Sequence, residues 1–402
     1  MKHVFRVLVA VCFLFALMAG PAVAGNVLTI KKGEPIHLAA WFVTTGPNSS
    51  LGIDTFRGLE IAIEDMGGSI KGHPVKLTSQ DEGCGPEGGQ TAASKIASDP
   101  TVLMAIGSSC SSAAKPGVPI LWKMKIPSIS ASNTAPFLTD PASGPDFDGY
   151  LRTCHNDKVQ GAVAAEFTFK KMGYKKAAAI HDGSVYAQSL AQVFADTFTK
   201  LGGTITSMEA VSPGDTDMRP VMTKIASGAP QMIYMPMFIP ETAHCVRQAK
   251  EVAGLEKVSL MSADGSFSPD FLAAAGNASV GMFHTSPDFS ALDASYKAFL
   301  EKFKKKYGTD PEAPFHAHAY DAMFLIKGAI EKVAVDKGGN LEIDRDAFNK
   351  ALHETKAMKG LTGTITCDEH GDCADPKIAV YQLADTDLKA NQMSKVPFWK
   401  AY

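Results

Sequence analysis

Short apolar segments that alternate with amphipathic helical patterns constrain the fold of this chain more than any other feature. Stretches with helical spacing of apolar side chains, such as residues 91–97 and 189–201, lie between these segments. Because parallel strands need a crossover connection, usually a helix, this alternation predicts βαβ units and a mainly parallel sheet. The strand candidates are residues 36–44, 75–79, 102–106 and 127–131, and then residues 177–181, 205–211, 232–237 and 258–261.

The alternation occurs twice and predicts two doubly wound α/β lobes. A length of 402 residues suits two or three domains of roughly 150 residues each. Residues 151–157, between the two runs, contain no long stretch rich in Pro, Gly or Ser, which indicates packed lobes and not a flexible tether. The chain is completed by helical patterns at 296–307 and 320–333 and by short strand candidates at 363–366 and 379–383.

Residues 1–24 have the pattern of a secretory signal peptide. Lys2 and Arg6 precede an apolar run at residues 7–19, and Ala22-Val23-Ala24 supplies the small side chains that signal peptidase requires. We therefore expect cleavage near Ala24-Gly25, a periplasmic protein, and no direct membrane insertion after cleavage. The alternative, a membrane anchor, is disfavoured because the apolar run is shorter than the roughly 18 residues of a spanning helix.

Several common enzyme and cofactor motifs are absent from the sequence. The chain contains no G-x-x-x-x-G-K-[ST], no H-E-x-x-H and no G-x-S-x-G. His316 and His318 are two residues apart and would lie on different faces of a helix, which disfavours a metal site. A formal net charge of −3 disfavours bulk affinity for nucleic acid. We therefore expect no cofactor, no metal and no nucleic acid partner.

Four cysteines form two candidate disulfide pairs. Cys367 and Cys373 bracket a short segment between two strand candidates, where a hairpin can bring them within bonding distance. The alternative there is a metal site with His370, although two cysteines and one histidine are few ligands. Cys84 and Cys110 lie near the carboxyl ends of successive strand candidates and are a plausible second pair. No partners are evident for Cys154 and Cys245.

Motifs at the strand–helix junctions resemble a known family when they are taken in order. They are Thr45-Gly46-Pro47, Phe56-Arg57-Gly58, Ile70-Lys71-Gly72, the serine-rich turn 107–112, the strand and turn 129–139, His181-Asp182 with Tyr186, and Arg247-Gln248-Ala249 with Gly254-Leu255. Their order and spacing over nearly all of the mature chain are similar to those of the periplasmic solute-binding proteins for leucine, isoleucine and valine, which serve ABC importers.

The resemblance implies two lobes that are joined by three crossing segments, with a ligand cleft between them. Together with the restart of the alternation near residue 151, it predicts lobe 1 at residues 26–153 and 288–361, and lobe 2 at residues 154–287 and 362–402. It also implies a disulfide between Cys84 and Cys110.

The resemblance further implies a set of ligand contacts. The ligand carboxylate would bind Ser111 and Thr134, with Ser132 and Asn133 as neighbours. The second lobe would contribute Tyr186, and Asp264 would take the place of the glutamate that usually pairs with the ligand ammonium. The family often has tyrosine where this chain has Leu51 and Phe238. These altered walls favour an amino acid or a similar small zwitterion over leucine in particular, and leave room for an aromatic or larger aliphatic side chain.

The function expected from the sequence is that of a non-enzymatic binding protein that delivers its ligand to a membrane permease. An exported amidase or hydrolase on a similar scaffold is the alternative. Such an enzyme needs a nucleophile, a base and an orienting group within hydrogen-bond reach, and no motif supplies them. A ligand sensor for a receptor is a further alternative, which the sequence does not distinguish from a transport protein.

Overall fold

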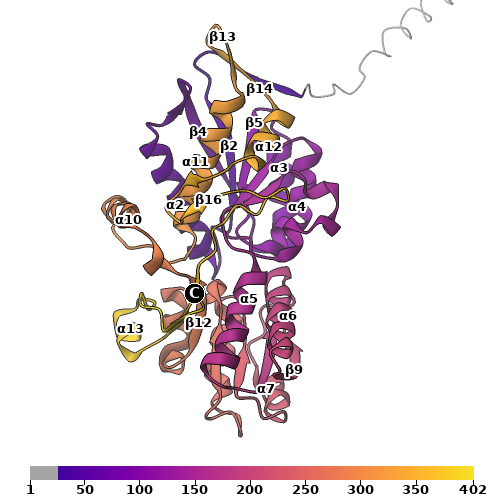
Figure 1. Cartoon of the computed structure of the whole chain (residues 1–402), viewed down its shortest axis with the longest axis vertical. Helices are drawn as coiled ribbons and strands as arrows, with labels where there is room; N and C mark the ends of the chain where they lie inside the picture. The colour runs from indigo at the N-terminus through magenta and orange to yellow at the C-terminus, as the bar shows by residue number, and fades with distance from the viewer. Residues whose placement is uncertain (1–25) are drawn as a thin grey trace, which may run out of the picture.

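The computed structural model describes residues 26–402, so the expected signal peptide at 1–24 lies outside the described residues. Figure 1 shows two lobes that follow one another along the long axis of the molecule, with the C-terminus beside their junction. We refer to the lobe that contains the first run of strands as lobe 1 and to the other as lobe 2. Within residues 26–402, no helix combines the length and the apolar character that are needed to cross a bilayer.

Lobe 1 is built on a six-stranded sheet with the order β3-β4-β2-β5-β6-β7. Its inner strands β2 and β5 are buried along their whole length and pair in parallel, as expected for strands that are covered on both faces. The strands are β2 (Ile36–Phe42), β3 (Ser69–Ile70), β4 (His73–Asp81), β5 (Val102–Gly107), β6 (Ser128–Ser130) and β7 (Tyr150–Arg152). A small sheet of β1 (Val27–Ile30), β13 (Val335–Lys337) and β14 (Asn340–Asp344) lies at the far end.

Helices from distant parts of the sequence cover the sheet of lobe 1. Helix α11 packs against α2 so closely that a Cβ atom on Gly58 would lie 2.2 Å from the carbonyl oxygen of His316, which explains the glycine. The helices are α2 (Ser49–Asp65), α3 (Pro86–Ala97), α4 (Ser111–Lys123), α10 (Ala294–Tyr307), α11 (His316–Val333) and α12 (Arg345–His353). The core of lobe 1 therefore depends on residues from beyond the second run of strands.

Lobe 2 is built on a seven-stranded sheet with the order β18-β17-β12-β11-β10-β8-β9, in which β17 runs antiparallel to both of its neighbours, β12 and β18. Its strands are β8 (Lys176–His181), β9 (Thr204–Ala210), β10 (Met232–Tyr234), β11 (Ser259–Ser262), β12 (Phe283–Pro287), β17 (Ile378–Gln382) and β18 (Trp399–Lys400). Its helices are α5 (Asp157–Glu166), α6 (Val185–Lys200), α7 (Arg219–Ala226), α8 (Ile239–Ala249), α9 (Pro269–Ala275) and α13 (Asp385–Ala390). The prediction of two doubly wound α/β lobes is confirmed.

Three chain segments connect the sheets: one after β7, one after β12 and one before β17. The third segment differs from the expected boundary after residue 361. Ile365, Cys367 and Cys373 pack in the core of lobe 1, where β15 (Met358–Lys359) and β16 (Thr364–Ile365) form a short hairpin. Ile378 packs in the core of lobe 2. We therefore propose that the third crossing lies between residues 373 and 378, which moves residues 362–373 into lobe 1.

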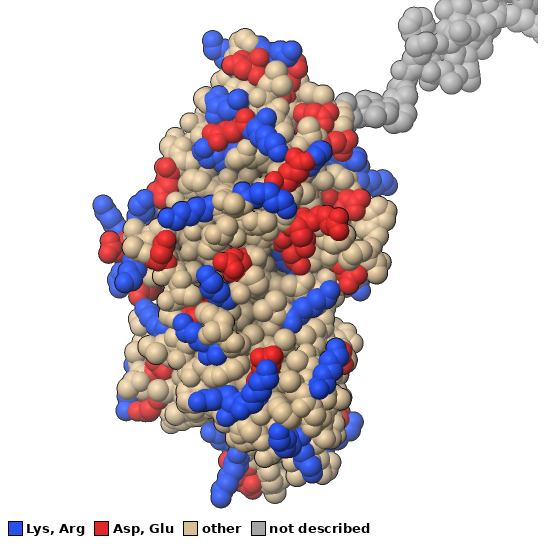
Figure 2. Space-filling model, in the orientation of Figure 1, with Lys and Arg blue, Asp and Glu red and all other residues tan. Residues whose placement is uncertain are grey.

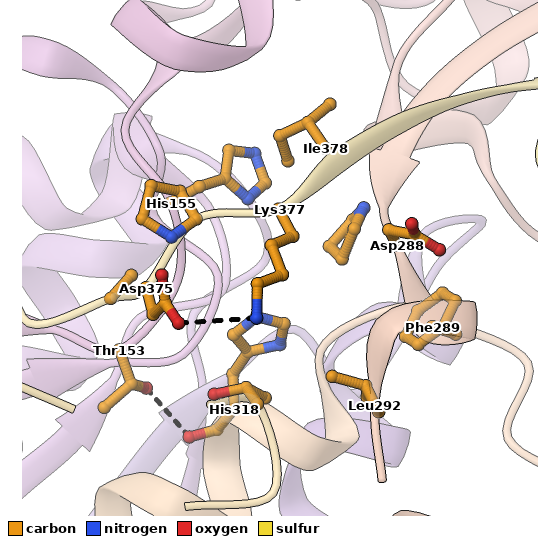
Figure 3. A pocket seen from close by; sticks show the side chains of 13 residues that line it. Thr153, His155, Asp288, Phe289, Leu292, His318, Asp375, Lys377 and Ile378 are labelled. Atoms are coloured by element: carbon orange, nitrogen blue, oxygen red, sulfur yellow. Dashed lines mark hydrogen bonds and ion pairs between the residues drawn. The ribbon is translucent and has the colours of Figure 1, made fainter. Parts of the chain in front are cut away.

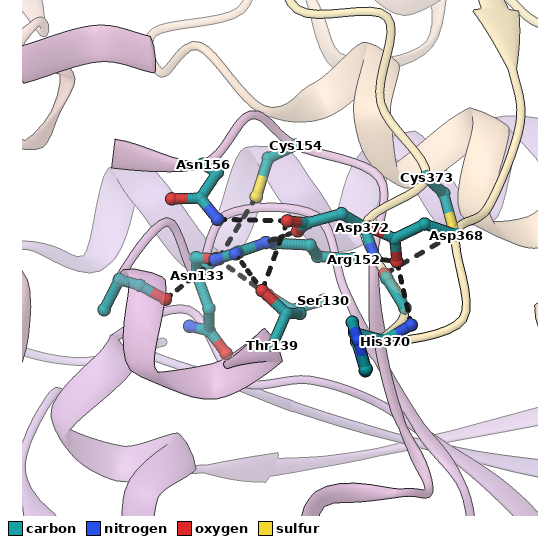
Figure 4. A network of polar contacts seen from close by, with 12 residues as sticks. Ser130, Asn133, Thr139, Arg152, Cys154, Asn156, Asp368, His370, Asp372 and Cys373 are labelled. Carbon is teal, nitrogen blue, oxygen red and sulfur yellow. Dashed lines mark hydrogen bonds and ion pairs between the residues drawn. The ribbon is translucent and has the colours of Figure 1, made fainter. Parts of the chain in front are cut away.

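A buried arginine ties this third segment to lobe 1. Arg152 is fully buried at the end of β7 and pairs with Asp372, whose segment also meets β7 through a bridge between these same two residues (Figure 4). The guanidinium also donates to the carbonyl oxygens of Asn133 and Ala135, at 3.1 and 2.9 Å. One side chain thus fixes both the third crossing and the turn that follows β6.

Two disulfides join the four cysteines that the sequence pairs. Cys84 is bonded to Cys110 and Cys367 to Cys373, so His370 and these two cysteines do not form a metal site. Cys154 and Cys245 are buried as free thiols.

Charged side chains of both signs are distributed over the surface. In the view of Figure 2, blue and red side chains are interspersed with uncharged residues over both lobes. This distribution agrees with the small formal net charge of −3.

Candidate functional site

The predicted ligand residues meet between the lobes because they follow the carboxyl ends of parallel strands. Such loops collect at one edge of a parallel sheet, where ligands of open α/β sheets bind. Lobe 1 contributes Leu51 in α2, Ser111 at the start of α4, and Ser132, Asn133 and Thr134 after β6. Lobe 2 contributes Tyr186 in α6, Phe238 before α8, and Asp264 after β11. All eight side chains are buried, so the lobes are closed over them.

Ser111 lies in the first turn of α4, where free N–H groups and the helix dipole favour an anion. The turn before it is held by the buried Glu82, which accepts from the N–H groups of Cys84 and Cys110 at 3.0 and 3.2 Å. Burial raises the pKa of Glu82 to about 8. The disulfide between the same two cysteines fixes this turn covalently. Glu82, which follows β4, and the disulfide of Cys110 therefore fix the start of α4 and with it the position of Ser111.

The turn after β6 presents two hydrogen-bond donors that have no partner within residues 26–402. They are Asn133 Nδ2 and Thr134 Oγ1, and both atoms are buried. The Asn133 amide is oriented, because its Oδ1 accepts from Ser108 and Tyr150, each at 3.3 Å. Ser132 is used differently: its hydroxyl donates to the carbonyl oxygen of Ser109 at 3.0 Å and braces the turn. Buried donors without partners are costly, so this turn is suited to a ligand with acceptor atoms.

On the side of lobe 2, Asp264 is held in place by Tyr186. The tyrosine hydroxyl donates to Asp264 Oδ1 at 2.8 Å and accepts from the N–H of Gly265 at 3.1 Å. A Cβ atom on residue 265 would lie 2.9 Å from the tyrosine ring, so glycine permits this close approach. The other oxygen, Oδ2, accepts no hydrogen bond from residues 26–402 but lies 3.1 Å from His155 Nε2.

His155 and Asp157 belong to this site and were missed by the sequence analysis. Both follow β7, in the segment that we interpreted only as a crossing between the lobes. Ligand residues are expected after the carboxyl ends of strands, and this expectation applies to β7 as it does to the other strands. Asp157 is fully buried at the start of α5, and neither carboxylate oxygen has a hydrogen-bond partner within residues 26–402. Its backbone N–H donates to the carbonyl oxygen of Thr134 at 2.9 Å, which brings the Asp157 carboxylate beside the turn that follows β6.

Burial and mutual repulsion shift the proton equilibria of this cluster. Burial and the charge of Asp264 raise the pKa of Asp157 to about 7. Burial lowers the pKa of His155, but the neighbouring carboxylate of Asp264 outweighs burial, and the pKa of His155 lies above its ordinary value. The cluster thus combines two carboxylates and one imidazole that favours its charged form.

A small cavity adjoins these groups between the lobes. Its volume is about 210 Å³, and Leu51 of lobe 1 and Asp264 and Phe267 of lobe 2 are among its lining residues. Phe238 packs against Tyr186 with ring centroids 5.3 Å apart, which places an apolar wall next to the hydroxyl that holds Asp264. The cavity is thus bordered by a carboxylate and by apolar side chains.

The larger pocket, of about 390 Å³, lies at the crossings and contains none of the predicted ligand residues (Figure 3). Thr153, Pro287 and Lys377 line it, one from each crossing segment, and Lys377 pairs with Asp375 at 3.4 Å. His155 also lines this pocket, so the crossings and the interlobe site share one residue. We interpret this pocket as part of the hinge, since all three crossing segments contribute to its lining.

A model of the family described as periplasmic binding proteins matches residues 35–387. The chain belongs to the periplasmic binding protein family. This result confirms the resemblance that was inferred from the strand–helix junctions.

Curated relatives cover most of the chain. The chain is 29% identical to the leucine-, isoleucine-, valine-, threonine- and alanine-binding protein of Pseudomonas aeruginosa, over 91% of this chain and 94% of that protein. It is also 29% identical to Leu/Ile/Val-binding protein homolog 3 of Brucella melitensis, over 85% and 89%. The crystal structure of a leucine binding protein of Thermotoga maritima superposes with a TM-score of 0.77, at 28% identity over 87% of this chain and 96% of that one.

Periplasmic binding proteins bind substrates, and one serine–histidine contact of this member deserves comparison with an enzyme site. Ser266 Oγ lies 3.2 Å from His284 Nε2. His284 is fully buried, its Nδ1 has no partner within residues 26–402, and burial lowers its pKa to about 3. A base needs a proton affinity near neutral pH and an orienting partner, so this pair lacks two requirements of a catalytic triad.

Proposed function

We propose that this chain is the solute-binding protein of an ABC importer and that it binds an amino acid between its lobes without altering it chemically. The observation that carries the proposal is a set of buried polar atoms without partners within residues 26–402, which comprises the donors Asn133 Nδ2 and Thr134 Oγ1 and carboxylate oxygens of Asp157 and Asp264. A zwitterion supplies the missing partner to both sets. The relatives named for leucine, isoleucine and valine support the same class of ligand.

In this proposal the ligand carboxylate binds lobe 1. The N-terminal turn of α4 at Ser111, the Thr134 hydroxyl and the Asn133 amide are its donors, and Ser132 supports the turn. The ligand ammonium binds Asp264 Oδ2 and Asp157, the two carboxylates that have free oxygens. Leu51, Phe238 and the Tyr186 ring surround the side chain of the ligand, which makes an uncharged aliphatic or aromatic side chain the best fit.

The proposal includes an exported protein whose partner is a membrane permease. The signal-peptide pattern of residues 1–24 supports export, and a binding protein of this family needs a transport or receptor partner to use its ligand. A sensor that reports ligand to a receptor would use the same site and differs only in its partner.

A thermal-shift screen of the twenty amino acids, their amides and short organic acids tests the function. An amino acid at 100 times its Kd should add about 2.7 kcal/mol to the free energy of unfolding. Mass spectrometry of the recovered ligand should then show it unchanged, whereas an amidase or hydrolase would release product. A screen in which no amino acid stabilises the protein contradicts the proposal.

Ligand should also draw the two lobes together. All eight predicted ligand residues are buried in the closed structure, and Val185 N–H of lobe 2 donates to Ser112 Oγ of lobe 1 at 3.0 Å, so entry of a ligand requires the hinge to open. We expect small-angle scattering to give a smaller radius of gyration with a stabilising amino acid than without it. An amino acid that gives no thermal shift is the control. An equal radius in both samples would argue against a site between the lobes.

The affinity for an amino acid should depend on pH through Asp157. The pKa of this carboxyl is about 7 in the closed structure, and only its ionised form can pair with an ammonium group. Binding therefore releases a proton below pH 7, and the affinity should fall by up to about tenfold for each pH unit below that value. Titration calorimetry between pH 5 and 8 measures the slope. Asp157→Asn should bind more weakly and with a flatter profile, and a wild-type profile without slope would contradict the role of Asp157.

A further inference from the structure

The cavity between the lobes has a polar side to which the proposed function assigns no role. Asn48 and Ser50, at the start of α2, line this cavity together with Ser268 of lobe 2. Among the residues within 26–402 that line it, Asp264 is the only charged one. The cavity that contains the proposed partner of the ligand ammonium is thus also bordered by uncharged polar side chains from both lobes.

Asn48 stands at the N-cap position of α2, but its side chain does not cap the helix. Asparagine is among the preferred N-cap residues because its oxygen can accept from an N–H of the first turn, yet the Asn48 side chain makes no such hydrogen bond. Its Oδ1 is buried and has no hydrogen-bond partner within residues 26–402. A buried acceptor without a donor is costly, and a ligand in the adjoining cavity can supply the donor.

The hydroxyl of Ser50 is also weakly bonded. Its Oγ lies 3.5 Å from Ser268 Oγ, which is the long limit of a hydrogen bond. Ser268 Oγ accepts from the backbone N–H of Asp270 at 3.3 Å and thereby caps α9. Since both serines are buried, the Ser50 hydroxyl gains a better partner if a polar group of the ligand lies beside it.

We propose that Asn48 and Ser50 form a polar subsite, and that the ligand is an amino acid whose side chain carries an uncharged hydrogen-bond donor, a hydroxyl or an amide. This donor bonds to Asn48 Oδ1, with the Ser50 hydroxyl as a second partner. A purely apolar side chain would leave the Asn48 oxygen without a donor. This inference rests on the proposed function, because it takes an amino acid with its ammonium group at Asp264 as given.

The subsite also disfavours a charged side chain on the ligand. Asn48 and Ser50 offer no counterion, and the α-ammonium of the ligand already occupies Asp264 in the proposed binding mode. An uncompensated charge between closed lobes is strongly unfavourable. The subsite therefore selects side chains that are polar and uncharged.

Amino acids of nearly equal size and different polarity test the subsite. Valine and threonine, norvaline and homoserine, and leucine and asparagine are three such pairs, in which only the second member carries a side-chain donor. Titration calorimetry measures the Kd of each for the wild-type protein. We expect the polar member of at least one pair to bind about tenfold more tightly than its apolar partner, because only the polar member satisfies the buried acceptor. An apolar pocket gives the opposite order, because the polar group would lose its water without compensation.

Replacing Asn48 assigns the preference to this side chain. Asn48→Leu keeps the approximate size and removes the acceptor, so the ratio of the two Kd values should fall to about one or reverse. Asn277→Leu is the matched control, since Asn277 is exposed and does not line the cavity, and it should keep the wild-type ratio. A purely structural role of Asn48 at the start of α2 predicts instead that both members of the pair weaken by the same factor.

The outcomes separate the subsite from the function on which it rests. If amino acids bind but no polar member is preferred in any pair, the subsite is wrong and the amino acid function stands. The subsite is also wrong if a folded Asn48→Leu keeps the wild-type ratio, or if 2,4-diaminobutyrate binds the wild-type protein as tightly as homoserine, which has the same size. If no amino acid binds at all, the proposed function itself fails, and this inference with it. The comparisons on the wild-type protein decide the matter even if Asn48→Leu does not fold.

Discussion

Replacing Asp264 with alanine is expected to weaken the binding of an amino acid by roughly 30-fold to several thousand-fold. The ammonium group of the ligand loses its water between the lobes and needs an anion there. Removing one partner of a buried charge pair costs about 2–5 kcal/mol, and each 1.4 kcal/mol corresponds to a tenfold change in Kd. The same change leaves the imidazole of His155 without the carboxylate that lies 3.1 Å away, which adds to the loss.

Three further variants show how the loss of affinity depends on charge and on hydrogen bonding. Asp264→Asn keeps the shape and loses the charge, so it should be nearly as damaging as alanine. Asp157→Asn should also weaken binding, since both oxygens of Asp157 are free to receive the ammonium. Tyr186→Phe is the matched control: it removes the 2.8 Å hydrogen bond to Asp264 without changing any charge, and we expect a smaller loss. Titration calorimetry with the best amino acid from the thermal screen measures all four proteins.

An uncharged ligand should be far less sensitive to these changes than an amino acid. The ammonium role of Asp264 would be falsified if Asp264→Ala bound the best amino acid within threefold of wild type while remaining folded. The natural ligand would then be a molecule without an ammonium group.

Removing the Cys84–Cys110 bridge should lower the free energy of unfolding by roughly 3–4 kcal/mol. The two cysteines are 26 residues apart, and cross-linking a loop of this length restricts the unfolded chain by about that amount in the chain-entropy treatment. The double variant Cys84→Ala, Cys110→Ala, unfolded in urea, measures the change. Its ligand affinity should fall as well, because Cys110 immediately precedes Ser111 in the turn that opens α4.

The second bridge is the matched control for the first. Cys367 and Cys373 are only six residues apart, so the same treatment gives about 2 kcal/mol for Cys367→Ala, Cys373→Ala. This pair is not part of the α4 turn and touches the site only through Asp372 and Arg152, so ligand affinity should fall less than for the first pair. Peptide mass spectrometry without reduction should show both links in protein from an oxidising compartment, and free thiols at either pair would contradict that bridge.

Local sequence patterns were sufficient to predict the strands that form the centre of each sheet. Strands β2 and β5 are buried along their whole length and are apolar apart from His37, because both of their faces are covered, and such runs stand out in any sequence. The third crossing could not be placed in the same way. The sequence pattern of the β15–β16 hairpin does not indicate which lobe the hairpin joins. The contacts of Cys367, Cys373 and Asp372 with lobe 1 are the basis for assigning it to lobe 1.

The site was predictable where a resemblance supplied the positions, and incomplete elsewhere. Ser111, Thr134, Tyr186 and Asp264 all lie at strand ends that meet between the lobes. His155 and Asp157 meet Asp264 only because α5 begins at the crossing, more than 100 residues before Asp264 in the chain. No pattern within residues 151–157 reveals that contact. The contact depends on how the end of β7, in the sheet of lobe 1, lies relative to the end of β11, in the sheet of lobe 2.

The interleaving of the two lobes along the chain determines when they can fold. Chains are synthesised from the N-terminus, and domains generally fold as units once they have emerged. The core of lobe 1 includes Met323 and Cys373, and that of lobe 2 includes Tyr381 and Met393, so a nascent chain that ends before α11 carries two incomplete cores. The core of neither lobe is complete until the late segments of both lobes have been synthesised. Both lobes can therefore complete their packing only when nearly the whole chain has been synthesised.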